Sequence, residues 1–167
     1  MKRRGFTLIE VLTATGLVAI TMTVVVIVLA GLSRSVRKQK TLSQIEREGN
    51  ETMINLRRSM AGIPLGGVDC GEGVGTSLTV TDEDGDTARM YCDEVASKIA
   101  SASAGGEVDL TTARVSVIGC ATFVSCQTMP ESGEVGSVDF GFGLGAGNSA
   151  VANEWVEREF RTKVVVR

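Results

Sequence analysis

An apolar run close to the N-terminus constrains the fold more than any other feature of this chain. It extends from Phe6 to Leu32, long enough to cross about 30 Å of hydrocarbon as a helix. One acid, Glu10, lies inside the run, and the basic segment Lys2–Gly5 precedes it. A carboxylate in hydrocarbon costs several kcal/mol, so Glu10 requires a partner. If the chain is cut between Gly5 and Phe6, the new amine of one copy can neutralise Glu10 of the next. The run therefore predicts a protein that packs against itself.

The segment Lys2–Val11 resembles the leader and cleavage site of type IV pilins and type II secretion pseudopilins. The resemblance implies cleavage after Gly5 by a prepilin peptidase, N-methylation of Phe6, and docking of neighbouring subunits through Glu10. It covers Lys2 to about Leu32, and about the last 100 residues carry no shared motif. Many type IV pilins have a proline in the second half of this helix, and this run has none. The basic leader and the later Arg57-Arg58 pair also resemble minor pilins of the initiating, tip-located kind.

Composition narrows the function classes. The chain has 17 basic and 20 acidic residues, and removal of the leader's three basic residues leaves a side-chain charge of −6 (14 − 20). Such a balance does not favour electrostatic binding of nucleic acid. There is no histidine, which removes the commonest metal ligand and general base. With no catalytic constellation or phosphate loop visible, we expect neither an enzyme nor a cofactor.

Four cysteines lie in the C-terminal part of the chain: Cys70, Cys92, Cys120 and Cys126. An even number in an extracytoplasmic domain predicts two disulfides. Of the three possible pairings, proximity in the sequence favours Cys70–Cys92 and Cys120–Cys126. A zinc site is the alternative, but only the spacing of Cys120 and Cys126 comes close to that of a ligand pair.

The charges around the apolar run leave its orientation ambiguous, because Arg34, Arg37, Lys38 and Lys40 follow it and the leader precedes it. The cysteines favour a cytoplasmic N-terminus and an extracytoplasmic head. We therefore expect a precursor in the inner membrane. After assembly the head would lie on a cell-surface or periplasm-spanning filament.

Residues 33–63 continue the helix in amphipathic form. Their apolar positions recur at gaps of three and four and are Leu42, Ile45, Gly49, Met53, Leu56, Met60 and Ile63. Pro64 and Gly66-Gly67 end the helix. The apolar stripe is interpreted as the core side of the helix, with a coiled-coil partner surface as the alternative.

Beyond residue 64 the apolar period changes to two, which predicts strands. Strands are expected over 76–81, 86–92, 113–118, 135–142 and 154–167, the last as an edge strand of the sheet. The segment 93–100 is ambiguous, with a short helix as one interpretation. A small flexible segment over 101–107 and a glycine-rich loop over 141–147 complete the expectation. The fold class is α+β, with a long N-terminal helix packed on an antiparallel sheet. The divisions are 1–5 (leader), 6–32 (membrane or filament-core helix), 33–63 (amphipathic helix) and 64–167 (disulfide-bonded head).

The acidic segment between the first two strands has two interpretations. Asp82, Asp84 and Asp86 are weak candidates for calcium ligands, since carboxylate oxygens suit that ion. A hairpin turn is the favoured interpretation, because Asp and Gly commonly build turns.

These patterns predict a structural subunit of a type IV pilus or type II secretion pseudopilus, major or minor. Its expected partners are other copies or other pilins, the prepilin peptidase, the inner-membrane assembly platform, and the membrane before assembly. The alternative is a membrane-anchored extracytoplasmic binding module that does not assemble.

Overall fold

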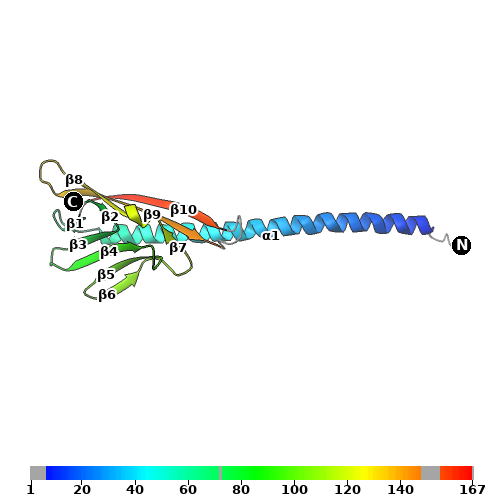
Figure 1. The fold of residues 1–167 in the computed structure, drawn as a ribbon, viewed down its shortest axis with the longest axis horizontal. Helices are drawn as coiled ribbons and strands as arrows, with labels where there is room; N and C mark the ends of the chain where they lie inside the picture. Colours follow the sequence, from blue (N-terminus) through cyan, green and yellow to red (C-terminus); the bar gives the residue numbers. More distant parts are fainter. Residues whose placement is uncertain (1–6, 72, 148–154, 167) are drawn as a thin grey trace. The chain divides into compact units, whose positions relative to one another are not determined.

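The computed structural model describes residues 7–71, 73–147 and 155–166 of the chain. It contains one long helix, α1 (Leu8–Ser59), followed by ten strands and a short 3-10 helix, η1 (Cys120–Thr122) (Figure 1). The chain divides into two compact units, residues 1–40 and residues 41–167. The strands are β1 (Val68–Asp69), β2 (Val74–Gly75), β3 (Ser77–Thr81), β4 (Thr87–Asp93), β5 (Lys98–Ser103), β6 (Gly106–Asp109), β7 (Ser116–Ile118), β8 (Val124–Thr128), β9 (Val135–Ala146) and β10 (Val156–Val165).

The described part of the first unit, residues 7–40, is helical from Leu8 onward. Thr7 opens the helix, and its carbonyl accepts from the amides of Glu10 (3.1 Å) and Val11 (3.3 Å). Every side chain from Thr7 to Lys40 is exposed. This stretch therefore owes its helical form to its own backbone hydrogen bonds, with no cover from the described residues.

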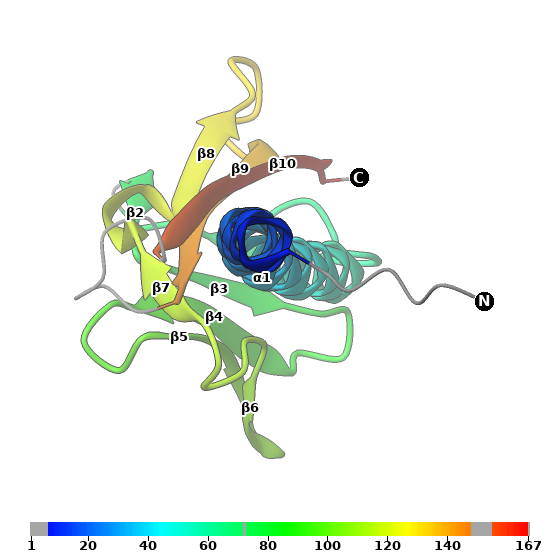
Figure 2. The ribbon, with the colours of Figure 1, turned by 90° about the vertical axis from the view of Figure 1, so that its right-hand side faces the viewer.

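The second unit holds two antiparallel sheets where the sequence predicts one. The first has the order β1-β3-β4-β5-β6, and the second has the order β10-β9-β8-β2, with β7 also paired to β9. Figure 2 shows both sheets beside the C-terminal part of α1. The α+β class is confirmed, and so is β10 as an edge strand of its sheet.

The β3–β4 hairpin is confirmed, with Thr81 opposite Thr87. The short helix considered for the ambiguous segment 93–100 does not form: β4 continues to Asp93 and β5 begins at Lys98 after a tight turn. Ser97 adopts a positive φ of 55° there, and its hydroxyl accepts from the Val117 amide at 2.9 Å. The segment 101–107, expected to be flexible, pairs as the β5–β6 hairpin.

The glycine-rich loop expected over 141–147 is also wrong, because β9 continues to Ala146. The glycines serve close packing. A Cβ at Gly143 would lie 2.6 Å from Ile118 Cγ1, and one at Gly145 would lie 2.3 Å from Trp155 Cζ2. Neighbouring side chains cover this face of β9, so no larger residue fits there.

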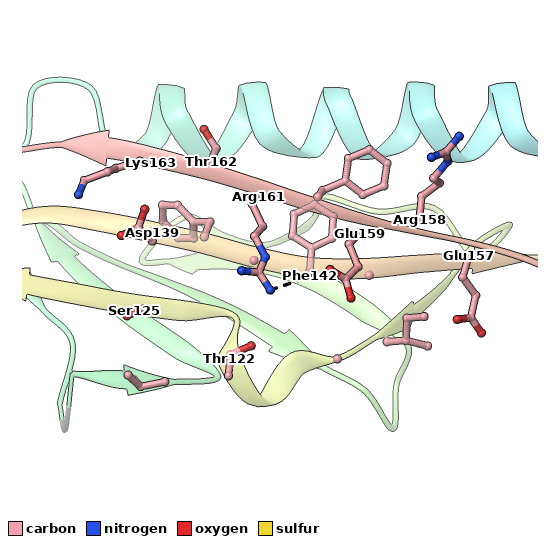
Figure 3. A pocket seen from close by; sticks show the side chains of 17 residues that line it. Thr122, Ser125, Asp139, Phe142, Glu157, Arg158, Glu159, Arg161, Thr162 and Lys163 are labelled. Atoms are coloured by element: carbon pink, nitrogen blue, oxygen red, sulfur yellow. Dashed lines mark ion pairs between the residues drawn. The ribbon is translucent and has the colours of Figure 1, made fainter.

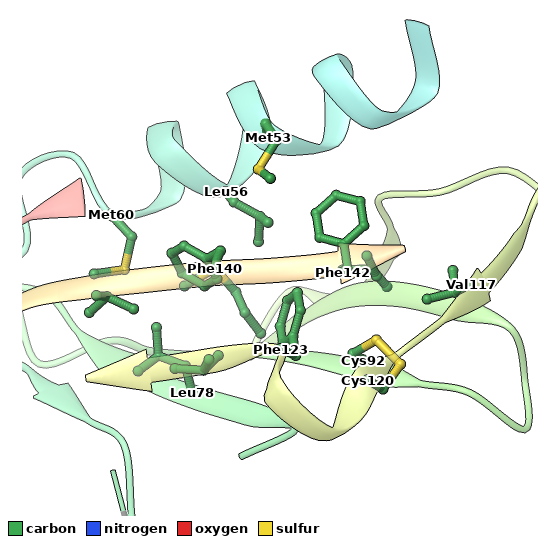
Figure 4. Packing of buried hydrophobic residues seen from close by; sticks show 14 of the residues in the cluster. Met53, Leu56, Met60, Leu78, Cys92, Val117, Cys120, Phe123, Phe140 and Phe142 are labelled. Carbon is green, nitrogen blue, oxygen red and sulfur yellow. A yellow bond between two sulfur atoms is a disulfide. The ribbon is translucent and has the colours of Figure 1, made fainter. Parts of the chain in front are cut away.

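The core lies between the C-terminal part of α1 and the inner faces of the two sheets (Figure 4). Ile45 and Leu56 on the helix are fully buried, as are Met90 on β4 and Phe123 after η1. Phe123 packs against Phe140, with ring centroids 5.7 Å apart. The apolar stripe of α1 is therefore confirmed as the core side of the helix. The chain's own head covers it, which leaves no free coiled-coil seam.

Two disulfides are present, but the pairing favoured from sequence proximity is wrong. Cys70 pairs with Cys126 and Cys92 pairs with Cys120, with Cα separations of 6.3 and 5.5 Å. The topology explains the error. β2 pairs with β8, which brings Cys70 beside Cys126, and the inward-facing Cys92 of β4 meets η1 across the core. Since no described cysteine is free, the zinc alternative is excluded.

The Phe160 ring of β10 packs directly against Gly49 of the helix, which predicts a severe effect of a side chain there. A Cβ at this position would lie 2.2 Å from the Phe160 ring. We expect Gly49→Ala to lower the free energy of unfolding of the head by about 1–3 kcal/mol, because the core must repack. Thermal or urea unfolding of the full chain in detergent measures it.

Gly31→Ala is the matched control, because a Cβ at Gly31 meets nothing within 4 Å. A second test is Phe160→Leu, which we expect to soften the effect of Gly49→Ala. Equal losses at Gly49 with and without the Phe160 change would contradict the packing argument.

Candidate functional site

The N-terminal segment is the first candidate site. Gly5 and Phe6, the predicted cleavage and methylation positions, lie outside the described residues. Glu10 is exposed in the first turn of α1. A negative charge is favourable at this end of a helix, because the unpaired backbone amides give it a partial positive charge. The helix geometry thus tolerates Glu10 but supplies no full countercharge.

The surface that surrounds Glu10 is almost entirely apolar. Glu10 is the single charged residue from Phe6 to Ser33. The large hydrophobic side chains beyond it are exposed, among them Leu12, Leu17, Ile20 and Ile27. α1 is long and apolar enough to cross a membrane, by length and composition. An exposed surface of this size requires lipid or protein cover.

The hydroxyl groups of this surface do not make it polar. Thr13 and Thr15 each donate to carbonyls three and four residues earlier, at 3.0–3.1 Å. Thr21 and Thr23 make similar bonds at 2.9 and 2.8 Å. Each of these hydroxyls is therefore satisfied within its own helix.

A second candidate is a shallow groove of about 1060 Å³ over the outer face of β9 and β10 (Figure 3). Gly141 and Gly143 form part of its floor, and the outward residues of β10 line one wall: Glu157, Glu159, Arg161 and Lys163. Arg161 and Glu159 form a loose ion pair at 3.9 Å, and Lys163 donates to Gln127 at 2.9 Å. Along this wall two acidic residues are followed by two basic residues, so the groove has no single charge that selects a ligand.

A cluster of charged residues lies on the outer face of the other sheet. Lys98 on β5 forms ion pairs with Glu107 and, at 3.3 Å, with Asp109 on β6. Lys98 and Arg89 also lie 6.0 and 5.9 Å from the ring centroid of Tyr91. The hydrogen bond from Lys98 lowers the pKa of the Glu107 carboxyl, and the bond to Glu107 raises the pKa of Tyr91. Sequence analysis missed this cluster, because its members come together only when β4, β5 and β6 pair.

The acidic segment between β3 and β4 forms a turn. The Asp82 carboxylate accepts from the amides of Asp84 and Asp86 at 3.0 and 2.9 Å, and Gly85 has a φ of 86°. In the described part of the chain, no group of three or more His, Cys, Asp or Glu residues is placed to hold a metal ion. The hairpin-turn interpretation of this segment is therefore confirmed.

Of the Arg57-Arg58 pair, only Arg57 has a contact with the sheet that the structure describes. Arg57 donates to the Thr162 hydroxyl of β10 at 2.6 Å and joins the helix to the sheet, while Arg58 is exposed. Arg158 of β10 makes a further contact with the helix, 3.8 Å from Glu46. Arg57 is therefore explained by the packing of the head.

The Lys98–Glu107 contact predicts a pH-dependent stability. Because Lys98 depresses the pKa of Glu107, its stabilising effect is present above the ordinary glutamate pKa of about 4.3 and is lost as pH falls through the lower folded-state pKa. We expect Lys98→Met to reduce the melting temperature at pH 7, and the gap from wild type to narrow below pH 4. Melting curves across pH 2–7 measure it.

Arg47→Met is the control for this measurement, because the Arg47–Glu51 pair is highly exposed and lies within one helix. Its effect on the melting temperature should be smaller at every pH. A gap for Lys98→Met that stays constant down to pH 2 would show that lost packing, not charge, is responsible.

Comparison with known proteins bears on the N-terminal candidate. Residues 1–26 match the family model described as the prokaryotic N-terminal methylation motif. No curated protein and no solved structure matches the chain. The matched segment includes Gly5, Phe6 and Glu10, so the resemblance found in the sequence is confirmed over this range. The chain thus carries at its N-terminus the prepilin-type cleavage and methylation signature of type IV pilins and pseudopilins.

Proposed function

We propose that the protein is a structural subunit of a type IV pilus or type II secretion pseudopilus, cleaved after Gly5 and assembled through α1. The observation that carries the proposal is the exposed apolar surface of α1 around Glu10. In the membrane precursor, lipid covers this surface. After extraction only the same surface of other subunits offers an equally dry environment.

Glu10 gives this packing a register. Cleavage would place the methylated amine of Phe6 four residues before Glu10, and the amine of one copy would neutralise the carboxylate of its neighbour. An unpaired charge in such an environment is costly, so a misaligned helix would be penalised. Glu10 would therefore favour the correctly aligned arrangement of neighbouring helices. Its proposed role is structural, not catalytic.

The head limits where self-packing takes place. From residue 41 the apolar stripe of α1 is buried under the two sheets, so the remaining surface of this part is mostly charged. Helix–helix packing would therefore involve mainly residues 6–32. The head would face outward and carry the groove over β9 and β10 to the filament surface.

Peptide mass spectrometry of filaments sheared from native cells tests the processing step. The expected result is a methylated N-terminal peptide that begins at Phe6. Its abundance relative to other pilins would distinguish a major subunit from a rare tip subunit. A chain that begins at Met1 and stays in the membrane fraction would overturn the proposal and favour the anchored binding module.

Substitution of Glu10 tests the docking step. We expect Glu10→Leu to reduce the yield of filaments at least tenfold while the protein remains in the membrane, because the neutralising pair is lost. Immunoblots of sheared and membrane fractions measure both quantities.

Thr13→Val, one turn further along the helix, is the matched control. The Thr13 hydroxyl is bonded to its own helix, so its loss should leave assembly unchanged. Normal filament yield from Glu10→Leu, or an equal loss from Thr13→Val, would contradict a specific role for Glu10.

A further inference from the structure

The two disulfides of the head are nested along the sequence. Cys70–Cys126 joins residues 56 apart, and Cys92–Cys120, which joins residues 28 apart, lies inside that loop. Cysteines that are neighbours in the sequence are therefore not partners in the fold. Native pairing needs the two long-range contacts, β2 with β8 and β4 with η1, to be in place.

An unfolded chain favours a different pairing. Cys70 and Cys92 are 22 residues apart, and Cys120 and Cys126 are 6 apart. The probability of closing a flexible loop falls roughly as the three-halves power of its length. By that scaling the two short loops together are favoured over the two native loops by about 40-fold. An oxidant that acts before folding should therefore produce the wrong pairs.

The wrong pairs also prevent the native fold. Cys92 is 6 % exposed and Cys120 is 3 % exposed, so their bond is part of the core between the sheets. A bond from Cys92 to Cys70 would hold the end of β4 against the segment after β1 and leave Cys120 without its partner. The fold cannot correct this error by packing alone, because no thiolate remains once both wrong bonds have closed.

We infer that this protein depends on a thiol–disulfide isomerase in the oxidising compartment where its head folds. The catalyst's thiolate attacks Cys70 Sγ in the Cys70–Cys92 bond, which forms a mixed disulfide and releases the Cys92 thiolate. The Cys92 thiolate attacks Cys120 Sγ, forms the native Cys92–Cys120 bond and releases the Cys126 thiolate. The Cys126 thiolate then attacks Cys70 Sγ and displaces the catalyst. Three exchanges leave two native disulfides and a regenerated thiolate, with no net oxidation.

Burial protects the native Cys92–Cys120 bond from thiol–disulfide exchange. After folding, Cys92–Cys120 lies within the apolar core, and only the half-buried Cys70–Cys126 bond is near the surface. Exchange needs a thiolate to reach the sulfur in line, which the packed core prevents at Cys92 and Cys120. The isomerase therefore acts on the unfolded or partly folded head and not on the finished protein.

Controlled oxidation of the full chain in detergent tests this inference. The reduced, urea-unfolded protein is diluted into excess diamide, a thiol-free oxidant, and the pairs are mapped by mass spectrometry without reductant. We expect Cys70–Cys92 and Cys120–Cys126 to exceed the native pairs at least tenfold. Protein disulfide isomerase with a trace of reduced glutathione should then convert them to the native pairs. A majority of native pairs with diamide alone would overturn the inference.

The double variant Cys92→Ala/Cys120→Ala is the matched control, because it retains only the native partners Cys70 and Cys126. Its single bond should form with diamide alone, and the isomerase should not change its yield. The readout is the identity of the bond, so it does not require the variant to fold. If the isomerase fails to convert the wild-type wrong pairs while the control oxidises normally, the inference also fails.

Discussion

One constraint governs this protein: a single helix carries apolar surface along most of its length, and the rest of the chain covers only part of it. From residue 41 onward two sheets bury the stripe from Ile45 to Leu56. Before residue 41 every described side chain is exposed. The same element therefore belongs to a conventional core in one unit and needs an external partner in the other. The proposed assembly follows from that difference.

The head must form a stable core from few large side chains. It has few aromatic residues, so Phe123 and Phe140 form a small aromatic centre and aliphatic side chains supply the rest. The two disulfides supplement this core, and Cys92–Cys120 ties the two sheets together across it. Gly49 allows close packing of the helix on β10, because the Phe160 ring lies directly against the helix backbone there.

The sequence predicts features that depend on local periodicity. The apolar stripe of α1 and the strands of the β3–β4 hairpin are repeated patterns of apolar residues, and both are confirmed. Predictions failed where the relevant neighbour is distant in the chain. Gly143 and Gly145 suggested a loop because the covering residues, Ile118 and Trp155, are not adjacent to them. The cysteines were paired by proximity, whereas sheet topology decides their partners. At the candidate site, the sequence and the family match identify Gly5, Phe6 and Glu10, and the structure places Glu10 in the first helical turn.

The threonines of the first unit have a consequence for transfer between environments. Thr13, Thr15, Thr21 and Thr23 keep their hydroxyl bonds within the helix, so these bonds do not depend on a lipid or a protein neighbour. The hydrogen bonds made by these hydroxyls are therefore the same in a lipid bilayer and in a helix bundle. The partition of this surface between bilayer and helix bundle is decided by packing and by the one charge at Glu10. A move of this segment between a bilayer and a helix bundle would break none of these hydroxyl bonds.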